Sequence, residues 1–95
     1  MDTKDKDQEI IDRSEAIAIQ YLKDTYDLDV KITRKQMQPK MAMSWVTFYG
    51  YVSQHEEQSF NVSINYEENR TESFSFSPEL EEVLLNEGYD PYKLE

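Results

Sequence analysis

The sequence lacks cysteine altogether, so it offers no disulfide, no thiolate metal ligand and no cysteine nucleophile. It has only 2 glycines, Gly50 and Gly88, too few for the glycine-rich loops that cradle phosphate groups. It has no run of about 18 apolar residues and no visible signal peptide, so nothing in it is expected to span a membrane. Met1 is either the native start or a replacement for a removed leader, and the two cases imply opposite sides of a membrane.

Positive charge is also scarce, because 10 lysines and arginines stand against 20 aspartates and glutamates, giving a formal net charge of −10. A field of this sign repels phosphate backbones and anionic lipid headgroups, so we expect neither nucleic acid nor a membrane surface as a partner. Residues 30–55 are the exception, because they carry Lys31, Arg34, Lys35 and Lys40 and no acid. We interpret this segment as a solvated β-hairpin with ordinary surface lysines.

Aromatic residues make up 13% of the 95 residues, more than is usual in disordered chains, so we expect a folded protein. A chain of this length supports one hydrophobic core and therefore one domain. Residues 1–8, MDTKDKDQ, alternate in charge and are predicted to be a flexible leader or tether. Residues 9–95 are predicted to form the single α+β domain.

Apolar residues recur every three to four positions from Glu9 to about Tyr26, which predicts an amphipathic helix. The period then falls to two, which predicts strands. The expected strands begin at Val30, near Met41 or Met43, at Phe60 and at Thr71. Polar turns are expected at Ser53–Gln58 and Glu67–Arg70, with Asn69 in a left-handed conformation.

A short second helix is predicted after the last strand. Ser77 has the properties of an N-cap, Pro78 suits the first helical position, and Gly88 is a C-cap signal. The tyrosines of residues 89–92 are expected to fold back on the domain. The predicted fold class is therefore α+β, with an N-terminal helix packed on a four-stranded antiparallel meander sheet and a short C-terminal helix. One face of this sheet is left uncovered.

Residue patterns for catalysis or metal binding are weak. His55 is the only histidine, and it lies in a predicted polar turn with no second histidine or cysteine to complete a metal site. The acids of the leader resemble a calcium loop but lack its glycine at the sixth position and its glutamate at the twelfth. No serine lies in a nucleophile elbow. We therefore expect no enzyme activity, no cofactor and no metal.

The uncovered sheet face is the remaining candidate for a functional site. Strand periodicity assigns Val46, Phe48 and Val52 to the core, and aromatic and small polar residues to the other face. The residues expected on that face are Trp45, Thr47, Tyr49, Tyr51, Asn61, Ser63, Asn65, Thr71, Ser73 and Ser75. Rings among hydroxyls and amides suit contact with a protein or a glycan. The alternatives are cross-strand pairs that only stabilise the sheet, or the packing of a homodimer.

Three stretches resemble parts of a known family: EAIAIQYLKDTYDLDVKI (15–32), FNVSINY (60–66) and FSFSPELEEVLL (74–85). The family comprises small lipoproteins of unknown function from Bacillus-like bacteria with a cystatin-like domain, and the resemblance covers about residues 9–87. It implies that MDTKDKDQ follows a lipidated cysteine, although that cysteine is absent from this sequence. Related cystatin-like lipoproteins include immunity proteins that neutralise secreted toxins at the outer face of the membrane. The resemblance assigns no binding residue.

Together with this resemblance, the sequence predicts a non-enzymatic, extracytoplasmic binding module of a membrane-anchored lipoprotein. Its expected partner is a protein, such as a toxin or a cell-envelope component, bound through the aromatic and polar sheet face. The alternative is a cytoplasmic acidic interaction protein or nucleic-acid mimic, of phage origin, whose acidic C-terminal segment contacts a basic partner. That alternative requires Met1 to be the native start.

Overall fold

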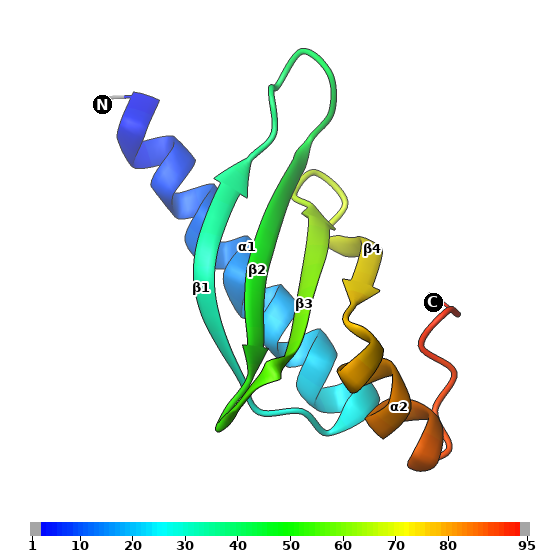
Figure 1. Ribbon diagram of the computed structural model, residues 1–95. Coiled ribbons are helices and arrows are strands. Elements are labelled where there is room, and N and C mark those ends of the chain that lie inside the picture. The colour runs from blue at the N-terminus through cyan, green and yellow to red at the C-terminus, as the bar shows by residue number, and fades with distance from the viewer. Residues whose placement is uncertain (1–2, 94–95) are drawn as a thin grey trace.

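The predicted architecture is confirmed by the computed structural model, which describes residues 3–93. The elements are α1 (Thr3–Tyr26), β1 (Val30–Met37), β2 (Trp45–Val52), β3 (His55–Asn65), β4 (Arg70–Phe76) and α2 (Pro78–Asn86). The strands form one sheet in the order β1-β2-β3-β4, and each neighbouring pair is antiparallel. Helix α1 runs diagonally across one face of this sheet, and α2 lies beside the end of α1 (Figure 1).

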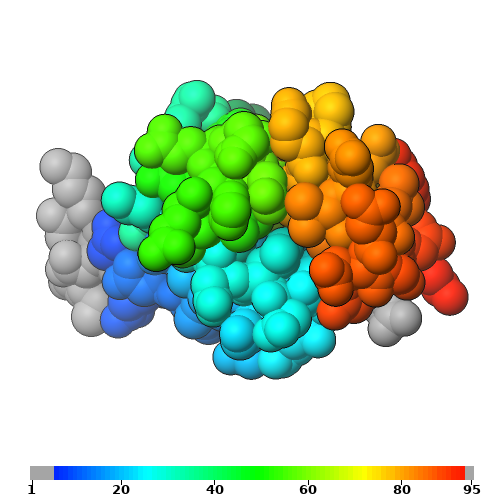
Figure 2. All heavy atoms as spheres, turned by 60° about the horizontal axis from the view of Figure 1, so that its bottom comes forward, coloured from blue at the N-terminus to red at the C-terminus, as the bar shows by residue number. Residues whose placement is uncertain are grey.

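The core lies between α1 and the sheet face that α1 covers. The helix contributes Ala18 and Leu22, and the two central strands contribute apolar residues at every second position. The side chains with no exposed surface in this layer are Ala18, Leu22, Val46, Phe48, Val62 and Ile64. Leu80 and Leu84 of α2 close one end of the core, where the end of α1 (cyan) lies beside α2 (orange) in Figure 2.

Helix α1 begins at Thr3, six residues before the helix start predicted at Glu9, so residues 3–8 of the predicted leader are helical. Residues 1 and 2 lie outside the described part. The extra turns are held by polar contacts, because Lys40 Nζ of the β1–β2 loop lies 2.6 Å from Asp7 Oδ1. Within the helix, Gln8 Nε2 donates to Asp12 Oδ1 at 2.8 Å. The periodicity of apolar residues does not reveal such polar contacts, which explains why the helix start was predicted six residues too late.

Strand β3 also begins earlier than predicted. Only Ser53 and Gln54 form the turn after β2, with Gln54 at a φ of 71°, and His55–Gln58, expected as part of a turn, belong to the strand. Ser77, which follows β4, holds this part of β3 in place. Its Oγ donates to the Glu57 carbonyl at 2.9 Å and accepts from the Ser59 amide at 3.2 Å.

Irregularities in the two edge strands change which residues share a face. In β1 the register shifts between Ile32 and Arg34, and in β4 it shifts so that Thr71 pairs with Ile64. Thr71 therefore lies on the helix-covered side, and its predicted place on the open side is wrong. Gly50 of β2 lies opposite the β1 shift, where it pairs with Ile32. A Cβ at Gly50 would lie 2.2 Å from the Lys31 carbonyl oxygen, so only glycine fits this close approach.

The C-terminal features follow the prediction. Ser77 Oγ accepts from the Leu80 amide at 3.3 Å, Pro78 is the first residue of α2, and Gly88 has a φ of 89° just beyond the helix. The tyrosines fold back as expected, since the ring centroid of Tyr89 lies 5.4 Å from that of Tyr26. Asn69 in the β3–β4 turn is left-handed as predicted, with a φ of 53°.

Candidate functional site: the open face of the sheet

The open face is the side of the sheet that faces away from α1 (Figure 1). Strand pairing arranges its side chains in four cross-strand rows. The rows are Lys31–Tyr51–Ser59, Arg34–Tyr49–Asn61–Ser75, Gln36–Thr47–Ser63–Ser73 and Gln38–Trp45–Asn65–Arg70. The ten residues predicted for this face all come from β2, β3 and β4. Strand pairing places nine of them on the open face, and Thr71 is the exception.

Aromatic side chains form a strip along β2 in this face. Trp45, Tyr49 and Tyr51 are each half-buried, so every ring keeps part of its surface exposed. The guanidinium carbon of Arg34 lies 5.0 Å from the centroid of the Tyr49 ring, which is a cation–π contact. This contact covers part of one ring and fixes the arginine over the strip.

Thr47 and Ser63 lie in the middle of the open face but are buried, at 5% exposed each. Their hydroxyl oxygens are 2.8 Å apart in a hydrogen bond, and Gln38 Nε2 donates to Thr47 Oγ1 at 3.0 Å. Larger neighbours cover these small side chains, although no helix lies over them. Their contribution is to the sheet itself, and a partner could not contact them directly.

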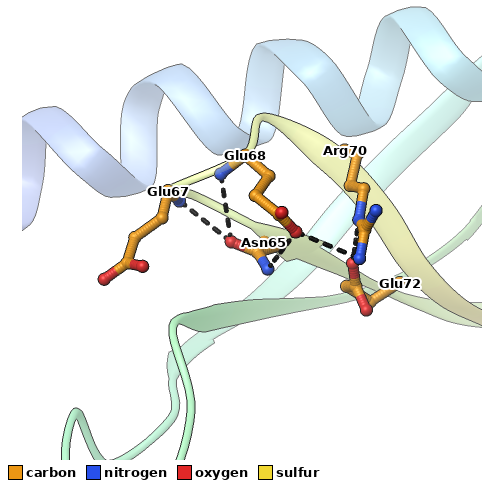
Figure 3. A network of polar contacts seen from close by, with 5 residues as sticks. All are labelled: Asn65, Glu67, Glu68, Arg70 and Glu72. Carbon is orange, nitrogen blue, oxygen red and sulfur yellow. Dashed lines mark hydrogen bonds and ion pairs between the residues drawn. The ribbon is translucent and has the colours of Figure 1, made fainter.

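The side chain of Asn65 makes its hydrogen bonds within the β3–β4 turn (Figure 3). Its side-chain oxygen accepts from the amides of Glu67 at 3.0 Å and Glu68 at 3.1 Å, and its Nδ2 donates to Glu68 Oε2 at 3.2 Å. Arg70 joins this network through ion pairs with Glu68, at 3.0 Å, and with Glu72. The hydrogen bond to Glu72 is the largest cause that raises the pKa of Arg70.

Asn61 and Ser75 differ from these residues because their polar groups are available. Within the described part of the chain neither side chain makes a hydrogen bond. They line a shallow hollow of about 400 Å³ together with Tyr49 and Tyr51. This hollow places two tyrosines beside an amide and a hydroxyl, a combination that can contact apolar and hydrogen-bonding groups at once.

The charge on the open face is positive along β1. Lys31 and Arg34 are exposed, and neither has a carboxylate partner among the described residues. Lys35 points the other way because of the β1 register shift, and its Nζ lies 2.8 Å from Glu15 Oε1 of α1. This hydrogen bond raises the pKa of Lys35. Within residues 3–93, the open face therefore has two cations without a carboxylate partner, in a molecule whose formal net charge is −10.

The contribution of β1 was missing from the sequence prediction. Simple alternation from Val30 would put Lys35 on the open face and Arg34 toward the helix, whereas the register shift reverses both. The shift occurs where Gly50 allows close approach of β1 and β2. Gly50 was the one signal in the sequence that could have indicated it.

Other candidate chemistry does not converge at a site. His55 is exposed, and its Nδ1 lies 3.6 Å from Glu57 Oε1. Among the described residues, no group of three or more histidines, cysteines or acids could hold a metal ion. No helix in residues 3–93 is long and apolar enough to cross a membrane. Comparisons of the chain with protein-family models, with curated proteins and with solved structures find no match.

Proposed function

We propose that this protein is a non-enzymatic binding module that recognises another protein through the open face. The observation that carries the proposal is the strip of half-buried rings, Trp45, Tyr49 and Tyr51, on a sheet face that no helix of the described chain covers. Trp and Tyr bury large areas at low cost in side-chain entropy and are enriched in protein interfaces. The available groups of Asn61 and Ser75 add hydrogen bonds that would fix the orientation of the partner.

The charges of the open face indicate which charges the partner's surface should carry. Lys31 and Arg34 are uncompensated, so the partner should present carboxylates opposite β1. The rest of the molecule is acidic and would repel the same carboxylates at other places. This contrast favours one docking orientation, since electrostatic complementarity contributes to specificity more than to affinity.

We further propose that the protein works outside the cytoplasm, tethered through a lipidated cysteine that precedes Asp2 in the native protein. The support is the resemblance to small lipoproteins of Bacillus-like bacteria, whose cystatin-like relatives include immunity proteins. A secreted toxin is therefore the first class of partner to test. The codons upstream of residue 2 in the gene decide the location, because a genuine start at Met1 would contradict it.

The experiment compares three forms of the full chain: wild type, W45A/Y51A, and the control I19A/L85A. The control removes two apolar side chains that are 40% and 51% exposed and lie on the helices. Each form captures proteins from the envelope and secreted fractions of a Bacillus-like bacterium. A protein retained by wild type and control is then purified, and its Kd is measured for all three forms. We expect W45A/Y51A to bind it about 30-fold more weakly or worse, as when interface aromatics are truncated.

The three forms must show the same circular dichroism spectrum, so that a loss of binding reports the surface. The proposal is contradicted if the same proteins bind equally to all forms. Binding that is unaffected by W45A/Y51A but collapses at high salt would favour the acidic interaction protein instead. A dimer of the free chain that W45A/Y51A dissociates would assign the open face to a second copy.

A further inference from the structure

A second hollow, of about 350 Å³, lies away from the open face, between the end of α1 and the C-terminal segment. None of the residues that line it belongs to the sheet. Apart from Thr25, its side chains are of two kinds, aromatic rings and charged groups. They are Tyr21, Asp24, Tyr26, Tyr89, Asp90 and Lys93.

The aromatic side chains of this hollow meet at right angles. The Tyr21 and Tyr26 ring centroids are 6.1 Å apart at an interplanar angle of 88°, and those of Tyr26 and Tyr89 are 5.4 Å apart at 90°. Tyr26 is buried among these rings, whereas Tyr21 and Tyr89 are half-buried and keep part of their surface exposed. Because the faces of aromatic rings are electrically negative, exposed ring surface of this kind is favourable for a cation.

The two carboxylates of the hollow are only partly used. Asp24 Oδ1 accepts from Gln20 Nε2 at 2.7 Å, and Asp90 Oδ1 accepts from the Tyr92 amide at 3.1 Å. Neither carboxylate has an ion-pair partner among the residues that the structure describes. The second oxygen of each acid is therefore available to a ligand with positive charge and N–H donors.

Tyr26 contributes to the hollow through its ring and not through its hydroxyl. Its side chain is 3% exposed, and its hydroxyl has no hydrogen-bond partner within the described residues. Because this hydroxyl is buried, it does not lie on the surface of the hollow. The polar groups that a ligand can reach are therefore the two partly free carboxylates.

We propose that this hollow binds a primary alkylammonium group, carried either by a free amine or by a lysine side chain of another protein. The ring surfaces accommodate the alkyl chain and attract the charge, and Asp24 and Asp90 accept N–H bonds from the ammonium. Lys93 lines the same hollow and is a cation of the same type. It therefore opposes the binding of an external ammonium.

The test titrates the full chain with n-butylammonium chloride and, separately, with N-acetyl-lysine amide, followed by NMR shifts of the tyrosine rings at constant ionic strength. D24N/D90N keeps the shape of both side chains and removes two charges. E79Q/E82Q removes two charges from α2 and serves as the matched control. We expect saturable binding by wild type and control, and about 10-fold weaker binding or worse by D24N/D90N, the loss expected for hydrogen bonds to a charged group.

K93A and K6A form a second matched pair, since each removes one lysine and Lys6 lies near the start of α1, far along the helix from the hollow. We expect K93A to bind about threefold more tightly and K6A to bind like wild type, because only Lys93 opposes the ligand locally. Similar affinity for both probes would assign the site to the ammonium itself, and stronger binding of the lysine amide would assign it to a protein side chain. The proposal is overturned if neither probe saturates, or if E79Q/E82Q loses as much affinity as D24N/D90N.

Discussion

The two faces of the sheet come from the same strands, one residue apart, yet they are buried in different ways. On the helix-covered face, Val46, Phe48 and Val62 have no exposed surface because α1 lies over them. On the open face, Thr47 and Ser63 are almost as buried, at 5% exposed, only because larger side chains surround them. Residues on the first face are buried because a helix covers them, whereas Thr47 and Ser63 on the second face are buried because their neighbours are larger.

We therefore expect the covered face to determine stability and the open face to be available for recognition. On the two central strands the covered face is apolar and continuous, so Val46, Phe48, Val62 and Ile64 contribute to one core. The open face is mixed, since Thr47 and Ser63 satisfy each other while Trp45, Tyr49 and Tyr51 keep exposed surface. Substitutions on the two faces should therefore differ in kind as well as in size.

The largest expected effect comes from removing a ring on the covered face. Phe48→Ala should lower the free energy of unfolding by about 3–5 kcal/mol, because Phe48 is fully buried under α1 and its loss leaves a cavity. Tyr49→Ala, at the next residue on the open face, should cost only about 1 kcal/mol, since its ring is already partly exposed. Urea unfolding of both variants measures the difference. Equal losses would mean that the open face is covered in solution.

The next effect concerns the close approach of β1 and β2. Gly50→Ala should cost about 3 kcal/mol, because the new Cβ would lie 2.2 Å from the backbone oxygen of Lys31 and cannot be relieved by moving a side chain. Gly88→Ala is the comparison, and it should cost only about 1 kcal/mol, since Gly88 has open space around it and only its φ of 89° is unfavourable. Thermal unfolding of the two variants, compared at one temperature, tests the order. A smaller loss at Gly50 than at Gly88 would contradict the register of β1.

Regular periodicity made most of the fold predictable from the sequence. The helical stripe indicated α1, and the alternation of Val46 and Phe48 with Trp45 and Tyr49 assigned both faces of β2 correctly. The start of α2 at Ser77–Pro78 could be predicted equally well, because capping depends on residues close in sequence. These features are local, so the local pattern was sufficient.

The features that the sequence did not indicate depend on contacts between distant residues. The start of α1 at Thr3 is supported by Asp7 and Lys40, which are 33 positions apart. The position of Thr71 depends on a register shift that appears only when β4 pairs with β3. The burial of Thr47 depends on neighbours from β1 and β3, so alternation gave its face correctly but not its exposure.

A smaller effect tests whether the buried polar pair of the open face only stabilises the sheet. Thr47→Val should cost about 2 kcal/mol, because it leaves the Ser63 hydroxyl buried without its 2.8 Å partner. The double variant T47V/S63A should recover part of this loss, since both polar groups are then absent. Chemical unfolding of both single variants and the double variant gives the coupling energy. A coupling near zero would show that the hydroxyls do not depend on each other.

The smallest expected effect compares two lysines of β1 that the register shift sends to opposite sides. Lys35 pairs with Glu15 of α1, whereas Lys31 lies exposed on the open face. Lys35→Gln should lower the free energy of unfolding at pH 7 by less than about 1 kcal/mol, because the Lys35 side chain is 40% exposed and solvent screens the pair. Lys31→Gln should leave it unchanged within about 0.5 kcal/mol.

The pH dependence distinguishes the ion pair from a packing effect at Lys35. The hydrogen bond to Glu15 raises the folded-state pKa of Lys35 above 10.5, its ordinary value. A raised lysine pKa stabilises the folded state fully below the unfolded-state pKa, and this stabilisation is lost as pH rises through the folded-state value. The difference between wild type and Lys35→Gln should therefore be constant from pH 7 to about pH 10 and shrink above it. A difference that persists at higher pH would assign the role of Lys35 to its aliphatic stem against α1, and would remove the electrostatic contrast between the two lysines.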